Sequence, residues 1–212
     1  MKASIVHHFL IGFMLAWIVP ISVQAQYFPS EVWHEGQVTL LKGDQLRGKI
    51  KYNLEADLIQ LNIDNTIQTF SARKILYFEI YDAEYERYRQ FYALPFETNG
   101  NYKVPRLFEV LHENTLTLLC REEVVQENIP QYGYYSYYGS RMGTRPRLVY
   151  NYFFLNQGGE IVRYSQKKDD LYAILTQNQD EIHQYIKKNH LKHDRQGDLV
   201  RITAYYNTLL NS

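Results

Sequence analysis

Apolar and polar residues alternate along most of the chain between Trp33 and Ser165. A period of two is typical of strands that bury one face, and turn-forming pairs such as Gly43-Asp44 and Asp64-Asn65 separate the alternating runs. Short strands joined by tight turns favour an antiparallel meander, because a parallel sheet needs long crossover connections. The expected strands cover residues 38–40, 46–52, 57–63, 67–72, 75–80, 88–94, 106–112, 115–121, 148–155 and 161–164. We expect a mainly antiparallel sheet that can curl into a barrel-like roll.

The hydrophobic period changes after Ser165, where apolar residues recur at helical spacing. Asn178 and Glu181 have the spacing of a capping box, which predicts the start of a helix. The apolar positions that carry the helical pattern are Leu171, Ile174, Leu175, Ile182, Tyr185, Ile186, Leu199, Ile202, Tyr206 and Leu209. Two or three short helices are expected in residues 166–212, packed on the sheet because isolated helices of this length are marginal in water. The predicted fold class is therefore α+β, with a β-rich domain over residues 26–165.

The N-terminus has the pattern of a secretory signal peptide. A basic start at Lys2 precedes the apolar run FLIGFMLAWIV at residues 9–19, and short side chains follow at Val23 and Ala25. We expect residues 1–25 to be removed and the chain to be exported, either periplasmic or secreted. About 11 apolar residues are too few to span a membrane comfortably, so no stable membrane span is expected after cleavage. Retention of the segment as an uncleaved anchor stays open.

Charge and cysteine content narrow the range of partners. The predicted signal carries one Lys and no acid, so the 23 Lys and Arg of the chain become 22 against 23 Asp and Glu. A near-zero balance provides no electrostatic footprint for nucleic acid, so no nucleic-acid partner is expected. Cys120 is the single cysteine and lies in an apolar run, which predicts a buried strand residue rather than a nucleophile.

No motif for catalysis, cofactor binding or metal binding is recognisable, so we expect no catalytic residue, cofactor or metal. His183, His190 and His193 lack a metal-ligand spacing. An acidic cluster, interleaved with Arg87 and Arg89, is interpreted as a solvated turn with weak ion pairs. The cluster consists of Glu79, Asp82, Glu84 and Glu86. Paired catalytic carboxylates are set by tertiary geometry, so a periplasmic hydrolase acting on glycan or cell-wall material remains the alternative function.

The stretch IPQYGYYSYYGSRMGTRPR at residues 129–147 is unlike the rest of the chain. It lies in a predicted loop at about 126–147, and loops of this length are usually functional or disordered. Tyrosine offers rigid amphipathic contact area, and arginine offers planar donors for carboxylates. The candidate binding residues are Tyr132, Tyr134, Tyr135, Tyr137, Tyr138 and Arg141, with an envelope protein or a glycan as the partner. The alternative interpretation is that this segment only connects two strands.

Three segments carry a resemblance to known sequences. They read GQVTLLKGDQLRGKIKYN at Gly36–Asn53, FSARKILYFEI at Phe70–Ile80, and KKDDLYAIL followed by LVRITAYYNTLL near the C-terminus. With the signal peptide, they resemble a loose group of uncharacterised secreted proteins from Bacteroidota. The shared motifs are turns and helix patterns, so the resemblance implies no activity and transfers no functional residue. The leading hypothesis is an exported, non-catalytic binding or assembly component of the cell envelope.

Overall fold

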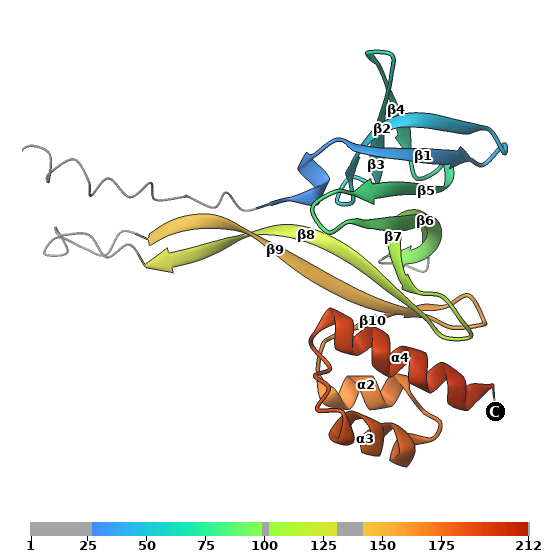
Figure 1. Cartoon of the computed structure of the whole chain (residues 1–212), viewed down its shortest axis with the longest axis vertical. Coiled ribbons are helices and arrows are strands. Elements are labelled where there is room, and N and C mark those ends of the chain that lie inside the picture. The colour runs from blue at the N-terminus through green and yellow to red at the C-terminus, as the bar shows by residue number, and fades with distance from the viewer. Residues whose placement is uncertain (1–26, 99–101, 131–141, 212) are drawn as a thin grey trace, which may run out of the picture.

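The computed structural model describes residues 27–98, 102–130 and 142–211, which form one antiparallel sheet with helices at the C-terminal end (Figure 1). This confirms the predicted α+β class. The strands are β1 (His34–Leu40), β2 (Gln45–Asn53), β3 (Leu58–Ile63), β4 (Thr66–Ser71), β5 (Ile75–Asp82), β6 (Arg87–Thr98), β7 (Tyr102–His112), β8 (Thr117–Pro130), β9 (Met142–Leu155) and β10 (Ile161–Tyr164). A short 3-10 turn, η2 (Pro29–Glu31), precedes β1. Within this described part, no helix is long and apolar enough to cross a membrane.

The sheet coils but does not close into a barrel. Its order is β10-β9-β8-β7-β6-β5-β1-β2-β3-β4, so β5 returns to pair with β1 on the side opposite β2. Only residues 72–74 join β4 to β5, and so short a connection requires the first strands to bend strongly around their core. The roll that the sequence allows is therefore an open one. Strands β4 and β10 remain as edges, because the chain from β8 onward turns its apolar face to the helices instead.

The predicted turns are confirmed where the backbone takes left-handed conformations. Asp64 and Asn65 have φ values of 48° and 64°, which is the pattern of a two-residue type I′ hairpin between β3 and β4. Gly43 has φ 92° in the turn between β1 and β2, where a residue with a Cβ atom would be strained. Local turn chemistry therefore determines the ends of these strands.

The helices are α2 (Lys168–Ile174), α3 (Gln179–Lys188) and α4 (Gln196–Leu210), and they lie against β8–β10 (Figure 1). Leu171, Ile182 and Leu199 are fully buried and share a core with Cys120, which is buried as expected. Helix α3 starts where the sequence predicts, but the capping box does not form. Asn178 has the left-handed φ of 52°, and its side chain makes no cap hydrogen bond.

Strands β8 and β9 extend beyond the rest of the sheet as a two-stranded arm, which we define as residues 121–130 and 142–151 (Figure 1). The pairing of β8 with β7 ends at Cys120, and the pairing of β9 with β10 ends at Tyr152. The two arm strands continue to pair with each other as far as Pro130 and Met142. The predicted loop at 126–147 is therefore too long, because both of its ends are strand. The sequence pattern missed residues 122–130 and 142–147 because their apolar residues do not alternate regularly with polar ones.

Candidate functional site

The arm leaves the sheet at a fork between β7 and β8. Beyond Cys120 the backbone of Leu107 in β7 has no β8 partner, and two side chains replace the missing strand. The Leu107 N–H donates to the Asp57 carboxylate at 2.9 Å, and its carbonyl accepts from Arg121 at 2.7 Å. Arg121 also bonds Asp57 at 2.8 Å and the Leu54 carbonyl. Because Asp57 and Leu54 lie in the β2–β3 turn, these bonds tie that turn to the base of the arm.

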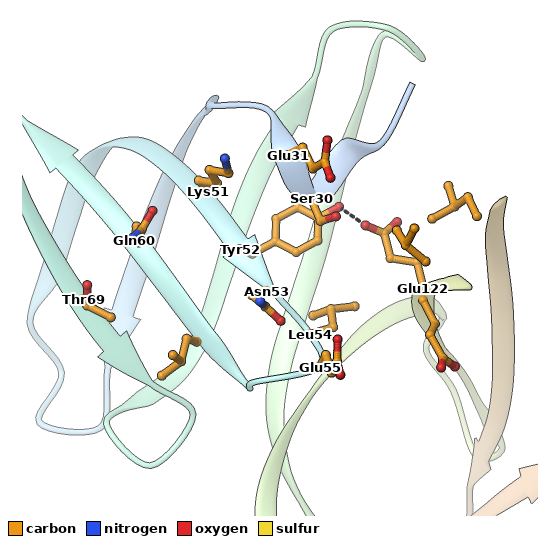
Figure 2. A pocket seen from close by; sticks show the side chains of 14 residues that line it. Ser30, Glu31, Lys51, Tyr52, Asn53, Leu54, Glu55, Gln60, Thr69 and Glu122 are labelled. Carbon is orange, nitrogen blue, oxygen red and sulfur yellow. Dashed lines mark hydrogen bonds between the residues drawn. The ribbon is translucent and has the colours of Figure 1, made fainter. Parts of the chain in front are cut away.

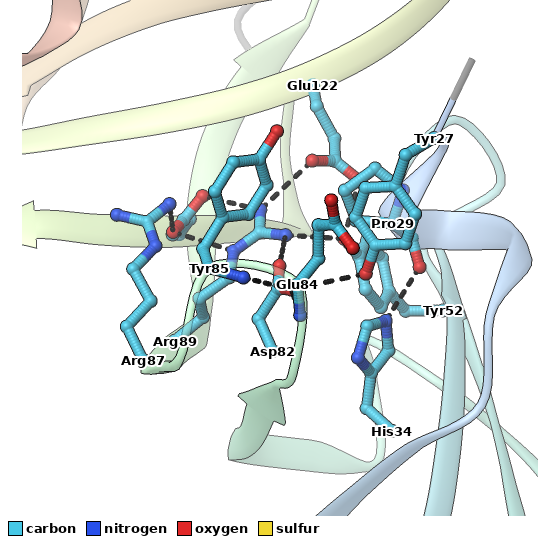
Figure 3. Close-up of polar contacts among 11 residues, drawn as sticks. Tyr27, Pro29, His34, Tyr52, Asp82, Glu84, Tyr85, Arg87, Arg89 and Glu122 are labelled. Atoms are coloured by element: carbon cyan, nitrogen blue, oxygen red, sulfur yellow. Dashed lines mark hydrogen bonds and ion pairs between the residues drawn. The ribbon is translucent and has the colours of Figure 1, made fainter. Parts of the chain in front are cut away.

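A buried network around Arg89 lies beside the fork (Figure 3). The Arg89 side chain is 2% exposed, and its guanidinium bonds Glu109 through two nitrogens, at 2.9 and 2.7 Å. It also reaches Glu122 at 2.9 Å and Asp82 at 3.4 Å. The Tyr52 hydroxyl donates to Glu122 at 2.5 Å and accepts from Arg89 at 3.0 Å. Strands β2, β5, β6, β7 and β8 each contribute one of these side chains, so the network fixes the arm to the coiled half of the sheet.

The charges in the network determine its protonation. Burial lowers the pKa of Arg89, but the hydrogen bonds and charge of Glu109, with further contributions from Tyr52 and Glu122, raise it well above its ordinary value. Burial is also the main cause that raises the pKa of Tyr52, and Glu122 adds to it. Arg89 therefore stays a cation and Tyr52 a neutral donor at any physiological pH.

A cleft of about 400 Å³ opens between β2–β4 and the arm (Figure 2). Tyr52, Leu54 and Glu122 are its buried lining residues. The remaining lining residues are Ser30, Glu31, Lys51, Asn53, Glu55, Leu58, Gln60, Thr69, Glu123, Val124 and Leu148. The cleft has the volume of a ligand pocket and a mixed polar and apolar surface.

The carboxylates that line the cleft differ in burial and in hydrogen bonding. Glu122 is its one buried acid among the described residues, and each of its two carboxylate oxygens already accepts a hydrogen bond, from Tyr52 and from Arg89. The other acids that line the cleft, Glu31, Glu55 and Glu123, are exposed. A general acid or base needs a carboxylate that is free to meet a substrate proton.

The predicted binding residues fall outside the part of the chain that the structure describes. Those residues are Tyr132, Tyr134, Tyr135, Tyr137, Tyr138 and Arg141, which lie between the ends of β8 and β9. The neighbouring Arg145 and Arg147 are described, and both pair with Glu127 across the arm, at 2.9 and 3.5 Å. These two arginines thus help to hold the arm strands together.

The structure corrects the interpretation of the acidic cluster. The acidic cluster is not simply a solvated turn, because Asp82 is fully buried and belongs to the Arg89 network. The alternation along β5 and β6 indicated that Asp82 and Arg89 are buried. Both residues lie at the alternate positions that, with Phe78, Ile80 and Phe91, form the buried face of these strands. His183, His190 and His193 are not gathered into a metal site, and no other group of metal-binding side chains occurs among the described residues.

A comparison of the chain with protein-family models, curated proteins and solved structures finds no match.

Proposed function

We propose that the chain is exported and acts as a non-catalytic binding or assembly component of the cell envelope. The observation that carries the proposal is the arm, in which β8 and β9 pair over ten residues each beyond the end of their pairing with β7 and β10. Ten strand residues extend about 33 Å. A two-stranded ribbon is marginally stable by itself, so this arm depends on its rigid base.

Buried and half-buried ion pairs and hydrogen bonds hold the base of the arm. Arg121 and Asp57 secure the fork, and the Arg89 network joins the arm to the coiled half of the sheet. Binding elements on rigid supports lose less conformational entropy on association. The tyrosine-rich segment lies between the two arm strands in the sequence, and its composition is suited to contact a protein or glycan.

The hydrolase alternative has weaker support. Its two carboxylates would have to include Glu122 if one of them were buried in the cleft, and both oxygens of Glu122 are already engaged by the network. The exposed acids of the cleft lack the shielding that tunes a catalytic carboxyl group. A binding role requires no such tuning.

The experiment compares envelope partners of the full-length chain and of a short-arm variant expressed in the same cells. In the variant, Val125 and Arg147 face each other in the ladder and are joined by Asn-Gly, which removes residues 126–146. A second variant changes the five tyrosines between residues 132 and 138 to serine. We expect cross-linking in intact cells to capture a partner that is lost in the short-arm variant.

The control replaces Lys187 and Lys188, which are exposed on α3, by glutamate. This variant should keep the partner, because its changes lie in the helices rather than in the arm. Capture that persists without the arm, in a variant with unchanged circular dichroism, would overturn the arm as the binding element. Mass spectrometry of the exported chain should find Gln26 at its N-terminus, and an intact Met1 in the cytoplasmic fraction would overturn export.

A further inference from the structure

We propose that the cleft accepts an extended, basic peptide segment of a partner protein, which pairs through its backbone with the free edge of β8. This inference rests on the proposed binding function and names the partner chemistry and the place where it docks. The site consists only of described residues on β2–β4, η2 and the arm. It does not depend on the tyrosine-rich segment.

One edge of β8 is unpaired in the arm. From Arg121 onward, β8 has β9 on one side and, within the described residues, no strand on the other. Unpaired N–H and C=O groups along an edge are a template for another strand. The consecutive residues Glu122, Glu123 and Val124 all line the cleft. Because neighbouring strand residues point to opposite faces, a cavity that touches all three approaches β8 from its edge.

The cleft lies between the end of β2 and the edge of β8. The opposite wall is the end of β2, whose pairing with β1 stops at Ile50, so Lys51, Tyr52 and Asn53 border the cleft on that side. Two long side chains, Tyr52 and Glu122, meet between β2 and β8, as Figure 2 shows. Among the described residues β2 and β8 are not paired with each other, and an added strand needs a spacing of about 4.8 Å beside the edge that it joins.

The strand edge and the charges of the cleft favour a basic peptide as the ligand. A free strand edge presents donors and acceptors at the repeat of an extended peptide, which a glycan does not match. Val124 is 39% exposed on β8 and offers an apolar contact for one side chain of the added strand. The exposed charged residues of the cleft are Glu31, Glu55 and Glu123, against the single cation of Lys51. This excess of negative charge favours a segment rich in lysine or arginine.

The test uses the mature chain and a synthetic peptide of about ten residues, alternating lysine with threonine or valine. Two further peptides carry N-methyl groups, one on the lysines and the other on the remaining residues. In a strand ladder only every second peptide N–H faces the neighbouring strand. The alternation of charge fixes the register, so one methylated peptide should lose binding and the other should retain it.

Hydrogen exchange locates the contact. The unmodified peptide should slow exchange of the outward-facing backbone amides of β8 between residues 122 and 125, while the amides of α4 stay unchanged. A glycan oligomer used as a second probe should cause no such protection. Equal binding of the two methylated peptides, or binding without protection of β8, would overturn strand addition.

Charge reversal tests the orientation. The double variant Glu55→Lys with Glu123→Lys should raise the Kd of the basic peptide about tenfold, because two attractive contacts become repulsive. The matched control is Glu97→Lys with Glu113→Lys, which changes the net charge equally at exposed positions outside the cleft. Equal weakening by the two double variants would reduce the effect to long-range charge and refute the docking site.

The outcomes separate this inference from the proposed function. The short-arm variant retains Glu122, Glu123 and Val124, so it should still bind the peptide while losing a partner held by the outer arm. Arm-dependent capture in cells together with no selective peptide binding would leave the proposed function standing and refute the cleft. Failure of both experiments would refute both.

Discussion

Replacing Arg89 by methionine is the most direct test of the buried network. Methionine has a similar length but donates no hydrogen bond, so Asp82, Glu109 and Glu122 would lose the cation that they share. Breaking a buried ion pair by removing one partner costs about 3–5 kcal/mol, because the remaining charges stay buried. For a chain of this size, that loss lowers the Tm by about 6–20 °C.

The matched control is Arg87→Met, which removes a cation from the same Glu109. The Arg87 side chain is 46% exposed and lies 3.6 Å from that carboxylate. A pair so open to solvent contributes up to about 1 kcal/mol, so this variant should stay near the stability of the parent chain. The large expected difference between two arginines on one carboxylate isolates the effect of burial.

The Arg89→Met variant should also respond to pH. Three buried carboxylates without their common cation favour proton uptake in the folded state. The folded variant then binds more protons than the unfolded chain, so its stability rises as the pH falls, opposite to the behaviour of a chain with well-paired carboxylates. We expect the deficit against the parent chain to shrink between about pH 7 and pH 5.

Urea unfolding of the mature chain, followed by circular dichroism at several pH values, measures both effects. Arg89→Lys belongs in the same series, because it keeps the charge but cannot form the two parallel bonds to Glu109, and it should fall between the parent and Arg89→Met. Equal losses for Arg89→Met and Arg87→Met, or a deficit that grows on acidification, would refute the reasoning.

Three further predictions concern packing and titration. Asn207→Ala should lower the free energy of unfolding, measured in urea, by about 1–3 kcal/mol. The reason is that the buried Asn207 amide hydrogen-bonds both the N–H and the carbonyl of Leu116. An unchanged free energy would contradict this role. Gly36→Ala should lower the free energy of unfolding by about 1–3 kcal/mol, because the added Cβ would lie 2.3 Å from a β5 carbonyl oxygen. Gly197→Ala is the control, since a Cβ there meets open space, and it should be neutral or slightly stabilising. Equal effects of the two variants would contradict the packing at Gly36. Burial raises the pKa of Tyr150 to about 12, so the stability that its protonated hydroxyl contributes should be complete below pH 10 and disappear as the pH rises towards 12. Tyr150→Phe should flatten this loss of stability. An unchanged loss in the variant would assign the effect to other tyrosines.

The sequence alone determined the class of fold, because the information for it is local. Period-two alternation indicates strands that bury one face, and Asp64-Asn65 adopts the left-handed turn conformation that these residue types favour. The change of period after Ser165 located the helices in the same way. Capping depended on more than spacing, since Asn178 has the residue type of a cap but a backbone conformation that prevents it.

The tertiary structure decided everything that joins distant segments. Arg89 lies in a run of exposed charged residues in the sequence. Only the packing of five strands brings Asp82, Glu109 and Glu122 around it. Residues 122–130 and 142–147 of the arm were not predicted as strands, because their apolar residues do not alternate regularly with polar ones. The cleft exists because β8 leaves β7 while β2 ends beside it. Hydrophobic period is a local property of the chain, whereas charge pairing and strand order depend on contacts between residues far apart in sequence.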